Sequence, residues 1–268
     1  MVDLIKQSYA IINTAIIVYE PYAIVVAISG GDDSLTTYYL AKALGVKIDA
    51  ILHINTRTGI PQTTQFVREL AEKDGIKYLE GDAGTTYENH VLNHGFFGRG
   101  FIAHTYTYRL LKSQYLRKEL SKIRQHKRNR NILILSGARI TESLNRAKNL
   151  DNSYRKDGAN IWVNLIHWWT KSDCMDFLAD NKICRNPVSI ELCRSGECMC
   201  GTMQSQQARL EASILFPEWG QWLDDLERRV MLKFPWAWGE NMPKKIVLTN
   251  QGNQSKFQPM CSSCLRKE

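Results

Sequence analysis

A stretch near the start of the chain combines the residue types that hold a phosphate. Residues 23–34 read AIVVAISGGDDS, in which an apolar, β-branched run is followed at once by two glycines. The apolar run predicts a strand buried on both faces, and the polar residues after the glycines are good N-caps for the helical segment LTTYYLAKAL. Because a glycine turn leaves backbone N–H groups uncovered at a helix N-terminus, we predict a phosphate or pyrophosphate there. Its ligands are Ser29, Gly30, Gly31, Asp32, Asp33 and Ser34; a plain strand-to-helix turn is the alternative.

The cysteines form a second set of residues capable of chemistry. All seven lie in the C-terminal half of the chain, which favours metal or redox chemistry over disulfides. Thiolates at short spacings, from two distant segments, surround a single zinc ion or iron–sulfur cluster, and spacing does not separate the two. Cys174 and Cys184 lie in apolar helical context and are predicted to be inert. The predicted metal ligands are Cys198, Cys200, Cys261 and Cys264, with Cys193 as the alternate.

Charge is concentrated in one segment. The chain has 268 residues and a formal net charge of +8. Residues 109–130 hold nine Lys and Arg against one acid, Glu119, so this segment alone carries 9 − 1 = +8. Such a focused field suits a polyanion such as nucleic acid, and a solvated helix face is the alternative. No secretory signal or membrane-spanning run is visible, so we expect a cytoplasmic protein with no membrane partner.

Strand and helix patterns alternate along the first part of the chain. Strands are predicted at 23–28, 47–55, 76–81, 131–137 and 161–170, separated by helical segments that include the basic helix 104–124. This alternation predicts an α/β fold with a doubly wound, mostly parallel five-stranded sheet. A helix after the fourth strand would place Arg139, Glu142, Ser143 and Arg146 on adjacent turns. We predict an α/β nucleotide-binding domain over residues 1–183 and a Cys-rich helical region over 184–268.

Four motifs, in order, resemble one family. SGGDDS is similar to the PP-loop, usually SGGxDS, of the adenine nucleotide alpha-hydrolase superfamily. NTRTGI followed by PQTTQFVREL, then SGARITESLNRA, then NPV with RSGECMCG resemble successive elements of the phosphoadenylyl-sulfate (PAPS) reductases. The resemblance covers about residues 20–201. It is strongest to the PAPS reductase-like branch with the DndC and SspD enzymes of DNA phosphorothioation, and to small phage-encoded reductase-like proteins.

This resemblance implies an ATP pyrophosphatase that adenylates an acceptor and supports sulfur transfer, such as nucleic-acid phosphorothioation or thiolation. It implies an adenine nucleotide, Mg²⁺ held by Asp33 or Asp32, a [4Fe–4S] cluster with zinc as the alternative, and a sulfur-donor protein of the cysteine desulfurase type. The segment from His53 to Thr58 would line the adenosine. Catalysis would involve Ser29, Asp33, Ser34 and Arg139, and the nucleotide would also contact His53, Asn55, Thr56, Gly59 and Arg146.

Two departures from the family pattern shape the alternatives. Asp32 stands where the PP-loop often has lysine, so a phosphate-binding cation is expected from Lys112, Arg139 or Arg146. The Glu-Cys-Gly-x-His tail of true reductases does not appear, and the last residues read CSSCLRKE. One alternative is a sulfonucleotide (PAPS or APS) reductase that uses a C-terminal thiol such as Cys264. The other is a non-catalytic protein that binds a nucleotide or nucleic acid and has a structural zinc knot.

Overall fold

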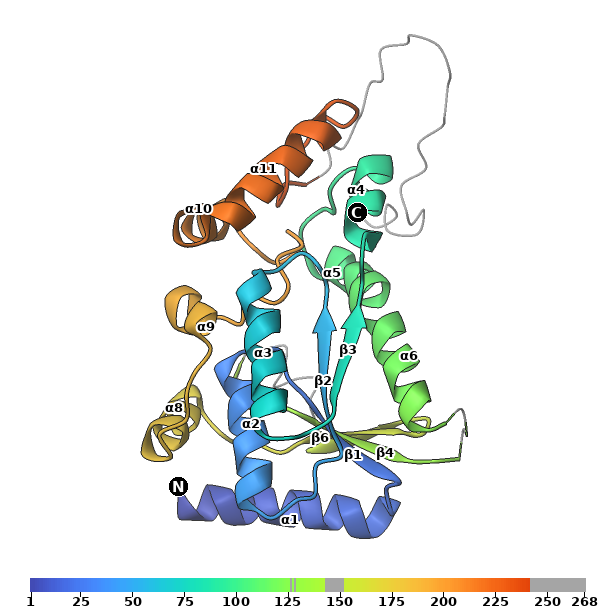
Figure 1. Ribbon diagram of the computed structural model, residues 1–268, viewed down its shortest axis with the longest axis vertical. Coiled ribbons are helices and arrows are strands. Elements are labelled where there is room, and N and C mark those ends of the chain that lie inside the picture. Colours follow the sequence, from blue (N-terminus) through green and yellow to red (C-terminus); the bar gives the residue numbers. More distant parts are fainter. Residues whose placement is uncertain (126, 128, 143–151, 242–268) are drawn as a thin grey trace, which may run out of the picture.

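The protein is built around a six-stranded sheet. The computed structural model describes residues 1–125, 127, 129–142 and 152–241. The strands run in the order β3-β2-β1-β4-β6-β5, and all neighbours are parallel except β5 and β6 (Figure 1). Their bounds are β1 Ala23–Ala27, β2 Ala50–Asn55, β3 Tyr78–Asp82, β4 Ile132–Ser136, β5 Tyr154–Asp157 and β6 Asn160–Asn164.

The predicted mostly parallel α/β sheet is confirmed, with one strand more than expected. β5 was missed because its sequence, YRKD, is short and almost entirely polar, and it lies exposed at the sheet edge. It forms an antiparallel hairpin with β6 around Gly158. The predicted strand 161–170 is too long, since β6 ends at Asn164 and the chain then turns.

Alternate residues of the strands face two different helical layers. Ile24 and Val26 of β1 belong to the larger core, which is covered by helices α1, α2, α3 and α8. Val25 faces the opposite side, where α6 covers β2 and β3. The sheet is therefore buried on both faces, as its apolar strands predict. The helix bounds are α1 Val2–Tyr19, α2 Asp32–Ala43, α3 Pro61–Lys73, α8 Lys171–Asp180 and α6 Gln114–Ile123.

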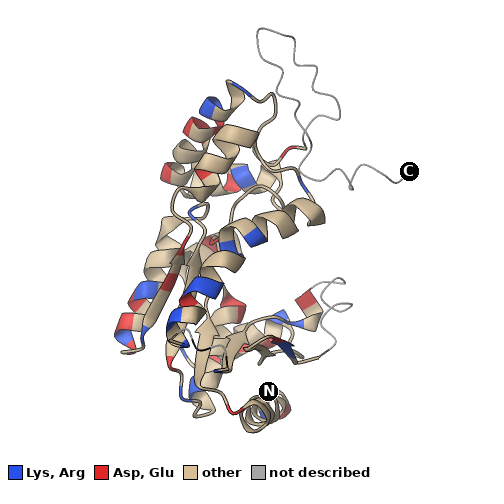
Figure 2. Ribbon diagram, turned by 90° about the vertical axis from the view of Figure 1, so that its right-hand side faces the viewer, with Lys and Arg blue, Asp and Glu red and all other residues tan. Residues whose placement is uncertain are grey.

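The basic helix predicted over 104–124 belongs to a longer helical stretch with an unusual turn. The stretch consists of α5 (Phe101–Tyr108), the π-helical segment η1 (Arg109–Ser113) and α6. A π segment widens the helix by one residue and often occurs at functional sites. On this stretch Arg109, Arg117 and Lys118 are exposed, and Lys122, also exposed, pairs with Glu119 at 2.7 Å. Figure 2 shows all described Lys and Arg in blue and Asp and Glu in red along the ribbon.

The segment after β4 differs from the predicted helix. Within the described part, Gly137–Arg139 form a loop and only Ile140–Glu142 form a 3₁₀ turn, η2. Arg139 therefore lies in a loop. Its side chain is oriented by its hydrogen bonds and not by the spacing of a helix. Ser143 and Arg146 lie outside the described residues.

A second apolar core joins the C-terminal helices to the middle of the chain. Trp219 and Leu223 of α11 and the buried Trp236 cluster with Tyr87 and Phe97. The helices are α4 (Thr86–His94), α9 (Pro187–Leu192), α10 (Gln206–Leu215) and α11 (Pro217–Met231), and Figure 1 shows α10 and α11 beyond the ends of β2 and β3. The division at residue 183 stays a prediction. Across the described segments, no helix has the length and hydropathy needed to cross a bilayer.

Candidate nucleotide-binding site

The loop between β1 and α2 has the form that an anion site requires. Gly30 has φ +79°, which glycine adopts without strain. The Ser34 hydroxyl donates to the Gly31 carbonyl at 2.8 Å and lies 3.3 Å from the Ser29 backbone N–H, which donates to it. These bonds close the loop over the start of α2. The first backbone N–H groups of a helix have no partner within the helix, so they are available to a phosphate.

A cavity of about 830 Å³ adjoins this loop. It lies beyond the carboxyl ends of β1, β4 and β6, and its lining includes Ser29, Asp33 and Ser34 from the loop, Ala138 after β4, and Lys112 of η1. In the strand order, β2 lies on one side of β1 and β4 on the other, which is the switch point where α/β sheets bind ligands. Its size suits a nucleotide.

A glycine after β4 allows the cavity to form. A Cβ on Gly137 would lie 2.7 Å from the backbone carbonyl of Asp33, closer than real Cβ atoms come to such atoms. The absence of a side chain therefore lets the loop after β4 approach the first turn of α2. This approach brings Arg139 to the PP-loop.

Asp33 lies among cations at the edge of the cavity. Arg139, which is buried, donates to Asp33 Oδ2 at 2.9 Å, and Lys171 Nζ lies 3.3 Å from Oδ1. The Nε of Arg139 has no hydrogen-bond partner among the described residues. Asp33 and Glu142 are the carboxylates that line the cavity, and Asp33 is the one in the PP-loop, so it fits a Mg²⁺ ligand, provided that it exchanges these partners for the ion.

Asp32 does not line the cavity at the PP-loop. Its buried carboxylate accepts two bonds from Arg185, at 2.8 and 3.0 Å, one from Lys171 at 2.9 Å and one from Ser189 at 3.3 Å. Burial alone would raise the pKa of Asp32, but Arg185 and Lys171 hold this pKa below its ordinary value. The carboxylate thus joins the PP-loop to the segment before α9. Its oxygens already accept bonds from Arg185, Lys171 and Ser189 and are not available to Mg²⁺.

The segment from His53 to Gly59 lies apart from the cavity at the PP-loop, and its predicted contact with the adenosine stays a prediction. His53 is buried between the Ile28 carbonyl and the Thr64 hydroxyl, 2.8 and 3.0 Å away, and burial lowers its pKa, so the ring is neutral. Thr56 is also buried and donates to the Glu197 carbonyl at 2.9 Å. Asn55 and Gly59 line a second cavity, and none of these four residues lines the one at the PP-loop.

Two of the predicted metal ligands lie together. Cys198 and Cys200 share a hydrogen bond, which lowers the pKa of Cys200 and raises that of Cys198. Cys193 is exposed at the end of α9, and Cys261 and Cys264 lie outside the described residues. Within the described ranges, no three His, Cys, Asp or Glu side chains group as a metal site. Because Cys198 and Cys200 lie side by side, they fit two of the four ligand positions of an iron–sulfur cluster or a zinc site.

Lys112 connects the thiol pair to the PP-loop cavity. It lines that cavity, and its Nζ lies 2.5 Å from Glu197 Oε2. Although burial opposes its charge, Glu197 and the neighbouring Cys198 raise the pKa of Lys112 above its ordinary value. Lys112 thus remains a cation between the PP-loop cavity and the cysteine loop.

Several residues of this network were not predicted. Lys171, Arg185 and Glu197 come from distant segments, and no motif marks the first of them. The sequence contains only an indirect indication of these cations: Asp32 replaces the usual PP-loop lysine, and such an acid requires a counter-charge. Asn186 belongs to the NPV motif, and its amide donates to the Gly30 carbonyl at 3.0 Å, which fixes the loop.

The family follows from the sequence over this same region. The phosphoadenosine phosphosulfate reductase domain matches residues 23–202, from the first strand to just past the thiol pair. The chain belongs to this family of PP-loop proteins. No curated protein matches the sequence.

Solved structures with similar folds are distant in sequence. A PAPS reductase from Candida auris is 14% identical with a TM-score of 0.49, over 68% of this chain and 82% of that one. The U34-tRNA thiolase NcsA from Methanococcus maripaludis, with its [4Fe-4S] cluster, is 13% identical with a TM-score of 0.47, over 85% and 78%. An FMN adenylyltransferase from Candida glabrata is 13% identical with a TM-score of 0.46, over 66% of this chain and only 56% of its own length. Likenesses at this level carry no information about substrate.

Proposed function

We propose that the protein is an ATP pyrophosphatase that adenylates an acceptor and supports sulfur transfer. The observation that carries the proposal is the position of Lys112, which lines the PP-loop cavity and is ion-paired beside the Cys198–Cys200 thiols. A nucleotide bound at the PP-loop would therefore lie on the other side of Lys112 from two sulfur atoms.

The loop is suited to splitting the bond between the α and β phosphates. A nucleophilic oxygen of the acceptor attacks the α phosphorus, the bond to the bridging oxygen breaks, and pyrophosphate leaves with the electron pair. The N–H groups at the start of α2, with the hydroxyls of Ser29 and Ser34, would stabilise the charge that grows on pyrophosphate. Arg139 and Lys112 would supply the positive charge that Asp32 does not, and Mg²⁺ at Asp33 would share the phosphate charge.

The thiol pair supports the sulfur-transfer step. A low thiol pKa favours the thiolate, which is both the nucleophile and the metal ligand, and Cys200 has the lower pKa of the two. Cys198 and Cys200, together with Cys261 and Cys264, would hold an iron–sulfur cluster. Such a cluster would relay sulfur that a cysteine desulfurase-type partner delivers. Exposed Arg109, Arg117 and Lys118 would contact the backbone of a nucleic-acid acceptor.

Reduction of a sulfonucleotide is the second candidate, and the family assignment favours it. The same loop would bind the phosphosulfate of PAPS or APS, and a thiol would attack its sulfur and release the nucleotide. A second thiol or an external dithiol would then release sulfite.

The two activities separate by their products. Protein purified without oxygen is incubated with ATP and, in the presence of a dithiol, with PAPS, and pyrophosphate, AMP and sulfite are measured. We expect pyrophosphate from ATP, reduced about 100-fold by Ser34→Ala, because one loop contact to the developing charge is lost. Thr14→Ala, on the exposed side of α1, is the matched control and should have no effect. Sulfite from PAPS without pyrophosphate from ATP would establish the second candidate.

A further inference from the structure

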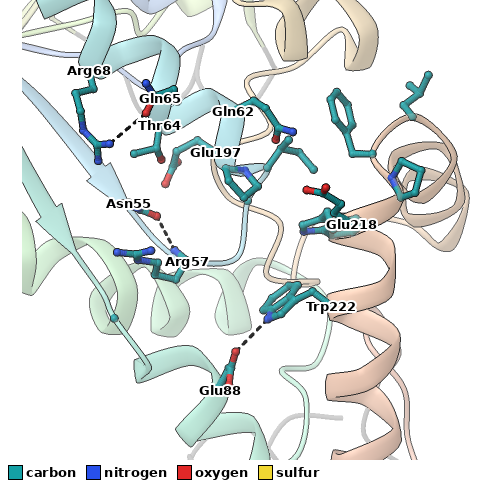
Figure 3. A pocket seen from close by; sticks show the side chains of 18 of the residues that line it. Asn55, Arg57, Gln62, Thr64, Gln65, Arg68, Glu88, Glu197, Glu218 and Trp222 are labelled. Atoms are coloured by element: carbon teal, nitrogen blue, oxygen red, sulfur yellow. Dashed lines mark hydrogen bonds between the residues drawn. The ribbon is translucent and has the colours of Figure 1, made fainter. Parts of the chain in front are cut away.

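A second cavity, of about 1190 Å³, lies beyond the ends of β2 and β3. Figure 3 shows Thr64, Gln65 and Arg68 of α3 along one side of it, and Trp222 and Glu218 of α11 across from them. It shares no lining residue with the cavity at the PP-loop. It is therefore a separate pocket of ligand size.

The charges in this cavity do not suit a phosphate. Its two arginines are already neutralised, since Arg57 is ion-paired with Asp82 and Arg68 lies 2.9 Å from Glu80. Three carboxylates line the cavity as well: Glu88, Glu197 and Glu218. A neutral ligand with hydrogen-bond donors fits this lining better than an anion does.

Aromatic side chains provide a wall for a flat ligand. Phe216, Trp219 and Trp222 all line the cavity, and Trp222 donates its indole N–H to Glu88 at 3.0 Å, which fixes the ring (Figure 3). Fixed aromatic faces bind other flat rings by stacking. The cavity thus combines ring-stacking surface with acceptor oxygens.

One carboxylate oxygen of Glu197 lacks a hydrogen-bond donor among the described residues. Its side chain is only 3% exposed, and Oε2 bonds Lys112 while Oε1 has no partner among the described residues. A buried carboxylate oxygen without a hydrogen bond is costly, so native structures usually provide a donor. Since Glu197 lines this cavity, a ligand N–H is positioned to be that donor.

We propose that this second cavity binds a nucleobase, stacked on the aromatic wall with a ring or amino N–H donated to Glu197 Oε1. The base would be that of a free nucleoside or of a single nucleic-acid strand. Through Glu197 and Lys112 it would be joined to the nucleotide at the PP-loop. Its role as the acceptor in sulfur transfer rests on the proposed function; its binding does not.

Calorimetric titration without ATP tests the site. The four ribonucleosides and short single strands are titrated into the full chain. We expect at least one nucleoside or strand to bind, and methylation of its N–H donor to weaken binding about tenfold, as expected for a lost hydrogen bond to a charged group. Trp222→Leu should weaken binding similarly, whereas Trp168→Leu, an exposed tryptophan outside both cavities, should not.

A blocking variant separates this proposal from the proposed function. Thr85→Trp would place an indole ring in the second cavity, so it should abolish base binding and leave binding of an ATP analogue at the PP-loop unchanged. Binding of strands alone, lost in this variant, supports the site and identifies the strand as the source; binding of a nucleoside that is at least as tight as that of the strands, and lost in this variant, supports the site and identifies the free form. If no probe binds, or if binding survives Thr85→Trp, the proposal is overturned, whatever the pyrophosphate assay gives.

Discussion

The presence of an acid at position 32 is explained by contacts with residues that are distant in the sequence. Where the PP-loop family often has lysine, this chain has a carboxylate that accepts bonds from Arg185, Lys171 and Ser189. These partners are more than 130 residues away, at the start of α8 and on either side of Asn186. The carboxylate of Asp32 therefore stabilises the loop by anchoring it to these distant segments.

Asp32→Asn should destabilise the protein at neutral pH. The substitution removes the negative charge of the buried Asp32 carboxylate and leaves Arg185 and Lys171 without their counter-charge, which costs about 3 kcal/mol of unfolding free energy. Urea unfolding of both proteins measures the difference. Asp225→Asn, which removes an exposed ion pair with Arg228, is the control and should change it by less than about 1 kcal/mol.

The loss should depend on pH in a defined direction. The folded-state pKa of Asp32 is depressed, so its stabilisation is present above the unfolded value of about 3.9 and is lost as pH falls through the folded pKa. The stability difference between wild type and Asp32→Asn should therefore be full at pH 7 and shrink in acid. A difference that grows as pH falls would contradict the anchoring role.

At the scale of elements, the π turn η1 decides where Lys112 lies. It interrupts an otherwise α-helical stretch from Phe101 to Ile123 and directs one lysine to Glu197, a residue of the cysteine loop. Other basic residues of this stretch remain exposed. The predicted role of the exposed residues in nucleic-acid binding stays a prediction, whereas Lys112 has a structural partner.

Lys112→Met should destabilise the protein because it leaves the buried Glu197 charge unpaired. We expect a loss of about 3 kcal/mol of unfolding free energy, and recovery of more than half of it in Lys112→Met with Glu197→Gln, which removes the orphaned charge. Chemical denaturation of the two single variants and the double variant completes the cycle. Additive losses would mean that the pair has no energetic coupling.

At the scale of the whole molecule, the sequence predicts those features whose residues lie close together along the chain. The strand, glycine turn and helix of the PP-loop are consecutive, so their pattern predicts them correctly. The contacts that join Lys112 to Glu197 and Asp32 to Arg185 span 85 and 153 residues, and no residue spacing in the sequence predicts them. The family resemblance places the segment after β2 at the adenosine, and this stays a prediction; in the structure Asn55 and Gly59 of this segment line the second cavity.

Binding of a non-hydrolysable ATP analogue tests the central claim, that the adenine nucleotide occupies the cavity beside Ser29–Ser34. Ala138→Trp would place a bulky ring in this cavity and Thr85→Trp one in the other, and neither residue belongs to the polar network. The account predicts that α,β-methylene-ATP binds the wild type and Thr85→Trp equally. It predicts that Ala138→Trp weakens binding more than about 100-fold, since a filled pocket excludes the ligand. Equal binding to all three proteins, or loss only in Thr85→Trp, would contradict it.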